Sequence, residues 1–187
     1  MISFKQFKTN LKVKTDIKYV ANRLGVGMIG MDPDYEKFFK EICMRMIYLK
    51  KEIEKIVGKE KALEIIGKAN ENALIQFTKE QLEKVEPIED FEDFKKFQRE
   101  AFKSPFLSNI VKGIIKRETS KEIESYIPNC LWYKTFNELE DTELGYVMCC
   151  HPDFAVASQY HPDIKLERTK TLMRGDKYCN HTYIWQK

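Results

Sequence analysis

Apolar positions recur with a helical period through the first two-thirds of the chain. Over residues 35–57 they return every three or four residues, which predicts a helix with one buried face. Asp32-Pro33-Asp34 precedes this helix and suits a cap followed by a proline in the first turn, and Gly58 marks its end. A second helix is predicted over residues 60–85, and Pro87 closes it.

Two shorter helices are predicted before the pattern changes near Arg117. A fourth helix begins at Ser104-Pro105 and carries apolar residues as far as Ile115. Ahead of it, a third helix is indicated by four regularly spaced phenylalanines, which are Phe91, Phe94, Phe97 and Phe102.

The remaining third of the chain predicts a mixture of strands and short helices. Residues 120–127 alternate like a strand, which we expect Pro128 to end. Residues 129–140, 143–150 and 153–160 predict short helical segments, and His151-Pro152 separates the last two.

The chain ends in a predicted hairpin. Its strands cover residues 164–173 and 178–185, with a turn at Arg174-Gly175-Asp176. Alternation along the last strand places Cys179, His181, Tyr183 and Trp185 on one face. We therefore expect an α+β fold in which a helical N-terminal two-thirds precedes a small antiparallel sheet with a C-terminal hairpin. We expect one domain over residues 1–187, mostly helical over 1–117, with the candidate site in the α/β part over 118–187.

Composition excludes several functional classes. Of 187 residues, 32 are basic and 29 acidic, and no long basic run is present, so we expect no nucleic-acid partner. No apolar stretch approaches the roughly 20 residues of a membrane span, and the N-terminal residues lack the features of a signal peptide. Five cysteines, an odd number, favour reduced thiols, so we expect a cytoplasmic protein that contacts no membrane. A homodimer is compatible with the sequence.

Reactive side chains concentrate in the last third of the chain. The set comprises Cys130, Cys149, Cys150, Cys179, His151, His161 and His181. Thiolate and imidazole groups are suited to act as nucleophile, base or metal ligand near neutral pH. The alternative is that each cysteine is a small buried apolar residue. A metal site of Cys130, Cys150, Cys179 and His181 is a further alternative, but no C-x-x-C pair is present, so we expect neither metal nor cofactor.

Two charged residues complete the candidate site. Arg168, on a predicted strand, carries a forked guanidinium that can hold a carboxylate through two hydrogen bonds. Its alternative role is a surface ion pair with Glu167. Asp153 follows Cys150 by three residues, so the thiol and the carboxylate could face one pocket, although an aspartate here could equally cap the next helix.

These segments resemble the L-2-amino-thiazoline-4-carboxylic acid hydrolase family. The resemblance rests on NCLWYKTFNEL, ELGYVMCCHPDFAVA and LERTKTLMRGDKYCNHTY, which cover roughly the last sixty residues. Family members share an E-L-G turn, a cysteine and an aspartate three apart, and a terminal R-T-x-T-L-x-x-G-x-x-x-C motif. One departure is that members usually have Asp-Phe after the last cysteine, where this chain has Asn180-His181.

The resemblance implies a cysteine-dependent hydrolase of C–N bonds in a small cyclic amidine carboxylate. The family reaction converts 2-amino-thiazoline-4-carboxylate to N-carbamoyl-L-cysteine. It implies Cys150 as nucleophile, with Cys179 as second candidate, and a Cys150 thiol of lowered pKa. Asp153 would be base or orienting group, and His181 a proton carrier.

The resemblance also implies which residues bind the substrate. Arg168 would anchor its carboxylate, and Thr169 and Cys130 would lie in contact with it. The alternative function is a vinyl-reductase-like domain that binds a small molecule or a metal without catalysis.

Overall fold

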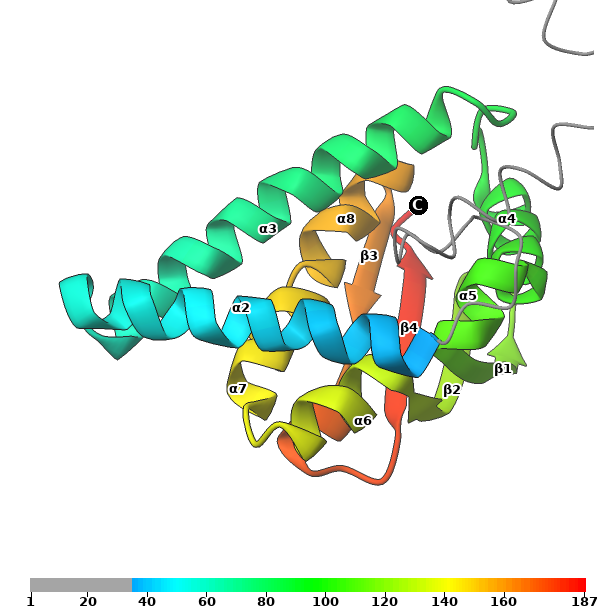
Figure 1. Ribbon diagram of the computed structural model, residues 1–187. Helices are drawn as coiled ribbons and strands as arrows, with labels where there is room; N and C mark the ends of the chain where they lie inside the picture. Colours follow the sequence, from blue (N-terminus) through cyan, green and yellow to red (C-terminus); the bar gives the residue numbers. More distant parts are fainter. Residues whose placement is uncertain (1–34) are drawn as a thin grey trace, which may run out of the picture. The chain divides into compact units, whose positions relative to one another are not determined.

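A computed structural model describes residues 35–187 and has an α+β fold, as the sequence predicts (Figure 1). The predicted cap at Asp32-Pro33-Asp34 lies outside the described residues. Residues Phe39–Lys187 form one compact unit, and the first four residues of α2 belong to another.

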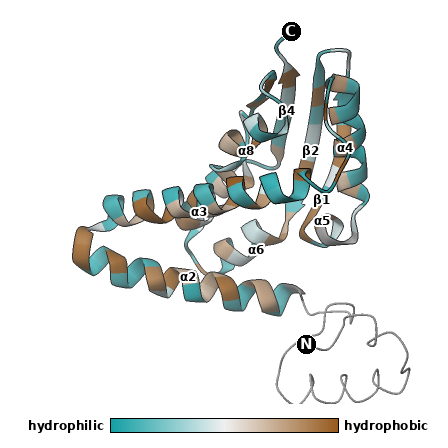
Figure 2. Cartoon of the chain, turned by 90° about the horizontal axis from the view of Figure 1, so that it is seen from above, coloured by the Kyte–Doolittle hydropathy of each residue, from teal (hydrophilic) through white to brown (hydrophobic). Residues whose placement is uncertain are grey.

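Two long helices begin the described chain, close to their predicted bounds. Helix α2 covers Tyr35–Val57 and α3 covers Lys59–Leu82. They meet at Gly58, whose φ of 82° lies in the left-handed region that favours glycine. Figures 1 and 2 both show the helices diverging from this turn, and the hydropathy colours of Figure 2 alternate along each helix.

Two further helices lead to the sheet, and here one prediction is wrong. Helix α4 covers Phe91–Lys103, and α5 covers only Pro105–Ile110. The next residues, Val111–Glu118, form strand β1 instead of continuing the fourth helix. Their apolar spacing fits a helix, but the β-branched residues Val111, Ile114 and Ile115 suit a strand, and antiparallel pairing with β2 decides between the two.

The sheet is antiparallel and has the strand order β1-β2-β4-β3. Strand β2 covers Glu122–Cys130, so Pro128 does not end it. Proline is tolerated there because the β1–β2 register shifts beside it and pairing with β4 stops at Ile127.

The predicted terminal hairpin is present with a shorter first strand. Strand β3 covers Ile164–Glu167 and pairs with β4, which covers Cys179–Trp185. Between them lies a 3₁₀ turn at Leu172–Arg174. As predicted from alternation, Cys179 and Tyr183 are both buried on one face of β4.

Short helices connect β2 to β3. Helix α6 covers Leu131–Glu138, α7 covers Thr142–Gly145, a π-helical turn covers Tyr146–Cys150, and α8 covers Asp153–Tyr160. None of the helices within 35–187 is long and apolar enough to cross a membrane.

The π-helical turn is held tightly between neighbouring elements. A Cβ added at Gly67 of α3 would lie 2.7 Å from Val147, and one added at Gly145 would lie 2.8 Å from Met173 and Phe136. These close approaches fix the turn against α3 on one side and against the 3₁₀ turn on the other.

Candidate functional site

A break in the helical backbone surrounds Cys150. Because Pro152 has no N–H, the carbonyl of Met148 lacks its usual donor four residues later, and the side-chain amide of Asn70 donates to it instead. The carbonyl of Cys150 accepts a hydrogen bond from Nη2 of Arg168. The π-helical turn and the proline thus expose carbonyl groups that side chains from distant segments bind.

Arg168 is the centre of an ionic cluster that we define as Asp153, Arg168 and His181. Its Nη1 lies 2.8 Å from Oδ2 of Asp153 and 3.2 Å from Nε2 of His181. Arginine only donates, so Nε2 of His181 is the acceptor and the ring proton is on Nδ1. The guanidinium also lies 4.8 Å from the ring centroid of Phe154, in cation–π contact.

Solvent reaches the members of the ionic cluster unequally. The Arg168 side chain is 2% exposed, whereas 32% of the Asp153 side chain and 19% of the His181 side chain are exposed. The carboxylate held by Arg168 in the free protein is therefore that of Asp153. A ligand can reach Asp153 from solvent more readily than it can reach the guanidinium.

Burial sets the protonation of the cluster. Desolvation raises the pKa of Asp153 to about 6, against the opposing effect of Arg168, so the carboxylate is ionised at neutral pH. Desolvation, followed by the charge of Arg168, lowers the pKa of His181 to about 3. At neutral pH the cluster holds a carboxylate, a guanidinium and a neutral imidazole.

A second group of side chains, the thiol cluster, consists of Cys150, Thr171 and Cys179. The Thr171 hydroxyl oxygen lies 3.7 Å from Sγ of Cys150 and 3.6 Å from Sγ of Cys179. The backbone N–H of Leu172 donates to Sγ of Cys179 over 3.3 Å. Both predicted nucleophiles therefore lie beside one buried hydroxyl group, which sequence reasoning missed.

The thiol cluster is buried. Cys150 is 9% exposed and Cys179 is 7% exposed. Burial raises the pKa of Cys150 to about 12, although Thr171 and Arg168 both act to lower it. The expected lowering of this pKa is thus wrong for the free protein, because desolvation outweighs the nearby guanidinium.

Two further cysteines, Cys130 and Cys149, pack against apolar clusters. Cys130 packs against Cys179 and Leu172, and burial raises its pKa to about 11. Cys149 packs against the apolar cluster around Phe136, and burial raises its pKa well above the usual value.

The alternative metal site is not assembled by the described residues. Within residues 35–187, no three His, Cys, Asp or Glu side chains are grouped as metal ligands. Of the four predicted ligands, His181 instead contacts the Arg168 cation and the Cys150 and Cys179 thiols contact Thr171.

Thr169 lies apart from both clusters. Its side chain is exposed and accepts a hydrogen bond from Nδ2 of Asn180 over 3.1 Å. Oδ1 of Asn180 accepts from the backbone N–H of Thr169 at 3.1 Å and of Lys170 at 2.7 Å. Asn180 therefore holds the connection that bears Arg168 and Thr171.

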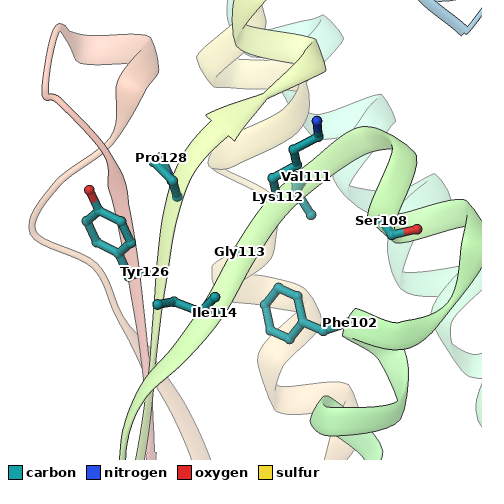
Figure 3. A pocket seen from close by; sticks show the side chains of 8 residues that line it. All are labelled: Phe102, Ser108, Val111, Lys112, Gly113, Ile114, Tyr126 and Pro128. Atoms are coloured by element: carbon teal, nitrogen blue, oxygen red, sulfur yellow. The ribbon is translucent and has the colours of Figure 1, made fainter.

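A hollow of about 400 Å³ lies elsewhere, where α4 and α5 meet the first two strands (Figure 3). Apolar side chains from Phe102, Val111, Ile114 and Pro128 line much of it, and Lys112 adds a charge. None of the predicted site residues lines this hollow.

A family model described as L-2-amino-thiazoline-4-carboxylic acid hydrolase matches residues 35–183. The chain belongs to this family. The matched region contains both the ionic and the thiol cluster, and the membership makes this chain one of a family of hydrolases. No curated protein matches the chain.

Proposed function

We propose that this member of the L-2-amino-thiazoline-4-carboxylic acid hydrolase family opens the ring of a small cyclic amidine carboxylate with a cysteine nucleophile. The observation that carries the proposal is that Arg168 binds both the Asp153 carboxylate and the carbonyl of Cys150. An acid–base group and the backbone of the cysteine are thereby held by one rigid guanidinium.

Asp153 is suited to proton transfer. A carboxylate with a pKa of about 6 is ionised at neutral pH and is still basic enough to accept a proton. Its charge acts on the Cys150 thiol, whose pKa it raises. We infer that the thiol loses its proton to Asp153 only as it attacks the substrate, since the free thiolate is disfavoured by burial.

With 2-amino-thiazoline-4-carboxylate, the proposed reaction has two steps, attack by Cys150 and then hydrolysis by water. Sγ of Cys150 bonds to C2, the proton passes to Asp153, and the C2–S bond of the ring breaks as the ring sulfur takes that proton. Water then attacks C2 with Asp153 again accepting a proton, and the Cys150 thiol leaves with it. Both nitrogens remain on C2 in N-carbamoyl-cysteine, so this substrate opens at its carbon–sulfur bond and not at the C–N bond expected from the sequence.

Three residues have supporting roles in this proposal. Arg168 positions Asp153 and the Cys150 backbone, His181 accepts from Arg168 and keeps it oriented, and Thr171 directs a hydroxyl at Sγ of Cys150. The Cys179 thiol, which shares that hydroxyl, is the second candidate nucleophile.

The test is a ring-opening assay of the full chain. The protein is incubated with 2-amino-thiazoline-4-carboxylate and N-carbamoyl-cysteine is measured by mass spectrometry. We expect turnover by the wild type and a fall in kcat of about a thousandfold or more for Cys150→Ser. Cys149→Ser is the matched control and is expected to retain the wild-type kcat, because Cys149 belongs to neither cluster.

Other results of this assay would assign the nucleophile differently or overturn the proposal. Loss of turnover in Cys179→Ser but not in Cys150→Ser would make Cys179 the nucleophile. Full turnover in both variants would overturn the cysteine mechanism, and no turnover by the wild type would overturn the hydrolase.

One observation favours a second candidate function, a domain that binds a small molecule without catalysis. Burial keeps the thiol of Cys150 protonated and 9% exposed, as suits a lining residue. Saturable binding of the carboxylate, together with no product over prolonged incubation, would favour this function over hydrolysis.

A further inference from the structure

A carboxylate substrate requires a cation that it can reach, and Arg168 does not offer one. Both terminal nitrogens of its guanidinium are engaged by the protein, and 2% of the side chain is exposed. A ligand carboxylate would have to displace Asp153 to bind there, which would remove the proposed base from its position. The proposed function therefore leaves the substrate's negative charge without a partner.

A second arginine, Arg174, contacts the same tyrosine ring as Arg168. The guanidinium carbon of Arg174 lies 3.8 Å from the centroid of the Tyr146 ring, and that of Arg168 lies 5.9 Å from the same centroid. The two cations are thus neighbours around one aromatic side chain. Unlike Arg168, Arg174 is exposed to solvent.

The backbone of Arg174 is hydrogen-bonded to Thr171, a member of the thiol cluster. It is the last residue of the 3₁₀ turn, and its N–H donates to the carbonyl of Thr171, whose hydroxyl contacts Cys150 and Cys179. Gly175 ends the turn with a φ of 88°. The position of Arg174 relative to the thiol cluster is therefore set by a hydrogen-bonded turn and not by a long flexible loop.

Arg174 also has an available charge. Across residues 35–187 no carboxylate pairs with it, and the nearest acid in sequence, Asp176, accepts from the backbone N–H of Thr171 at 2.8 Å. Stacking on Tyr146 covers one face of the guanidinium and leaves its edge N–H groups free to donate. Lys170, in the same connection, donates to the Tyr178 hydroxyl at 3.0 Å.

We propose that Arg174 binds the carboxylate of the substrate, with Tyr146 holding the guanidinium in orientation. This inference rests on the proposed function and names the group that recognises the substrate class, a small ring that bears a carboxylate. A planar guanidinium can receive such a carboxylate through two parallel hydrogen bonds. Arg174 would then hold the acid group while the reactive carbon of the ring faces the thiols and Asp153.

The experiment measures binding separately from turnover. The Cys150→Ser protein is titrated by calorimetry with 2-amino-thiazoline-4-carboxylate, and the same titration is repeated after adding Arg174→Gln. We expect the Kd to rise roughly tenfold or more, as for the loss of a charge-assisted pair. Arg174→Lys is expected to recover part of the affinity, because a lysine restores the charge without the fork.

Two controls separate recognition from a general loss of charge or fold. Lys177→Gln removes one exposed positive charge from the same connection and is expected to leave the Kd unchanged. In the Cys150-intact protein, Arg174→Gln is expected to raise KM and keep kcat, whereas 2-amino-thiazoline, which lacks the carboxylate, should be handled equally by both forms.

The two proposals fail in different ways. Turnover with a KM that Arg174→Gln does not change would overturn the role of Arg174 and leave the hydrolase intact. Carboxylate binding that depends on Arg174 without any turnover would support Arg174 and overturn the hydrolase. Absence of binding to the Cys150→Ser protein, or an equal effect of Lys177→Gln, would overturn the inference.

Discussion

The ionic cluster and the thiol cluster meet at Cys150, yet their environments differ. Asp153 is 32% exposed and ionised at neutral pH, whereas Cys150 is 9% exposed and its pKa is raised to about 12. The ionised carboxylate therefore lies where solvent can reach it, whereas the Cys150 thiol is buried and protonated. A buried thiol of this kind needs a nearby base at the moment of attack, and the ionic cluster provides one within the same short stretch of chain.

The largest effect is expected from removing the negative charge of Asp153. Asp153→Asn is expected to lower kcat/KM by about a hundredfold to ten-thousandfold, the usual contribution of a general base. In the wild type, kcat/KM should rise with pH through a value near 6, because the raised pKa of Asp153 means that its carboxylate becomes protonated below that point.

The pH profile of Asp153→Asn should lack this acidic limb. His181 is not expected to contribute one, since its pKa is lowered to about 3 and the ring stays neutral over the range. A limb near pH 6 that persisted in Asp153→Asn would contradict the assignment of the base.

Removing the cation of the ionic cluster should have the next largest effect, on stability. Arg168→Met leaves Asp153 without its partner and the Cys150 carbonyl without its donor, and we expect the free energy of unfolding to fall by about 3 kcal/mol. Urea denaturation measures this loss. The matched control is Arg117→Met, whose pairs with Glu122 and Glu124 are exposed at the surface, and its loss should be about 1 kcal/mol or less. Equal losses of unfolding free energy in the two variants would show that the ionic cluster stabilises the fold no more than a surface ion pair does.

Within the thiol cluster, the shared hydroxyl can be removed with little change of shape. Thr171→Val should cost about 1 kcal/mol in unfolding free energy. Because the Thr171 hydrogen bond lowers the pKa of Cys150, its loss should raise that pKa further and slow the alkylation of Cys150 by iodoacetamide. Thr182→Val, on the opposite face of β4, is the control, and an unchanged alkylation rate in Thr171→Val would contradict the contact.

The smallest effect is expected at Asn180. Because its Oδ1 acts as an acceptor for two backbone N–H groups, an aspartate oxygen can replace it, and Asn180→Asp should change unfolding free energy by less than about 1 kcal/mol. Asn180→Ala leaves both N–H groups without that acceptor and should be the more destabilising. If Asn180→Asp were the worse variant, the amide donor to Thr169 would be the important contact.

Much of the architecture could be predicted because it follows local periodicity. The long helices and the terminal hairpin show clear spacing of three to four residues or of two. Strand β1 could not be predicted, since Ile114 and Ile115 satisfy a helical spacing and only pairing with β2 distinguishes the two structures. The predicted end of the strand at Pro128 was wrong for a related reason. The register shift that accommodates the proline depends on the pairing of β1 with β2 and cannot be read from one strand alone.

Several residues that the sequence singles out lie together in the structure, but the contacts between them could not be predicted. Cys150, Asp153, Arg168 and His181 could be singled out by chemistry, but nothing in the sequence indicates that Arg168 would bind a carboxylate of its own chain. Thr171 was missed because threonine is common in strands, so its presence in a predicted strand indicates no function. Its role depends on two sulfur atoms that are distant from each other in sequence.

The π-helical turn at Tyr146–Cys150 has a consequence for how this arrangement could be gained or lost. Such a turn holds one residue more than the α-helical turn it replaces, so inserting a single codon is enough to create it. Deleting one residue would restore an ordinary helix and rotate the residues before the deletion relative to those after it by about 100°. Cys149 and Cys150 would then point in new directions relative to Thr171, and the thiol beside Thr171 would be replaced by a neighbouring side chain. Length variation at this one point is thus a simple genetic route between a form that places Cys150 beside Thr171 and one that does not.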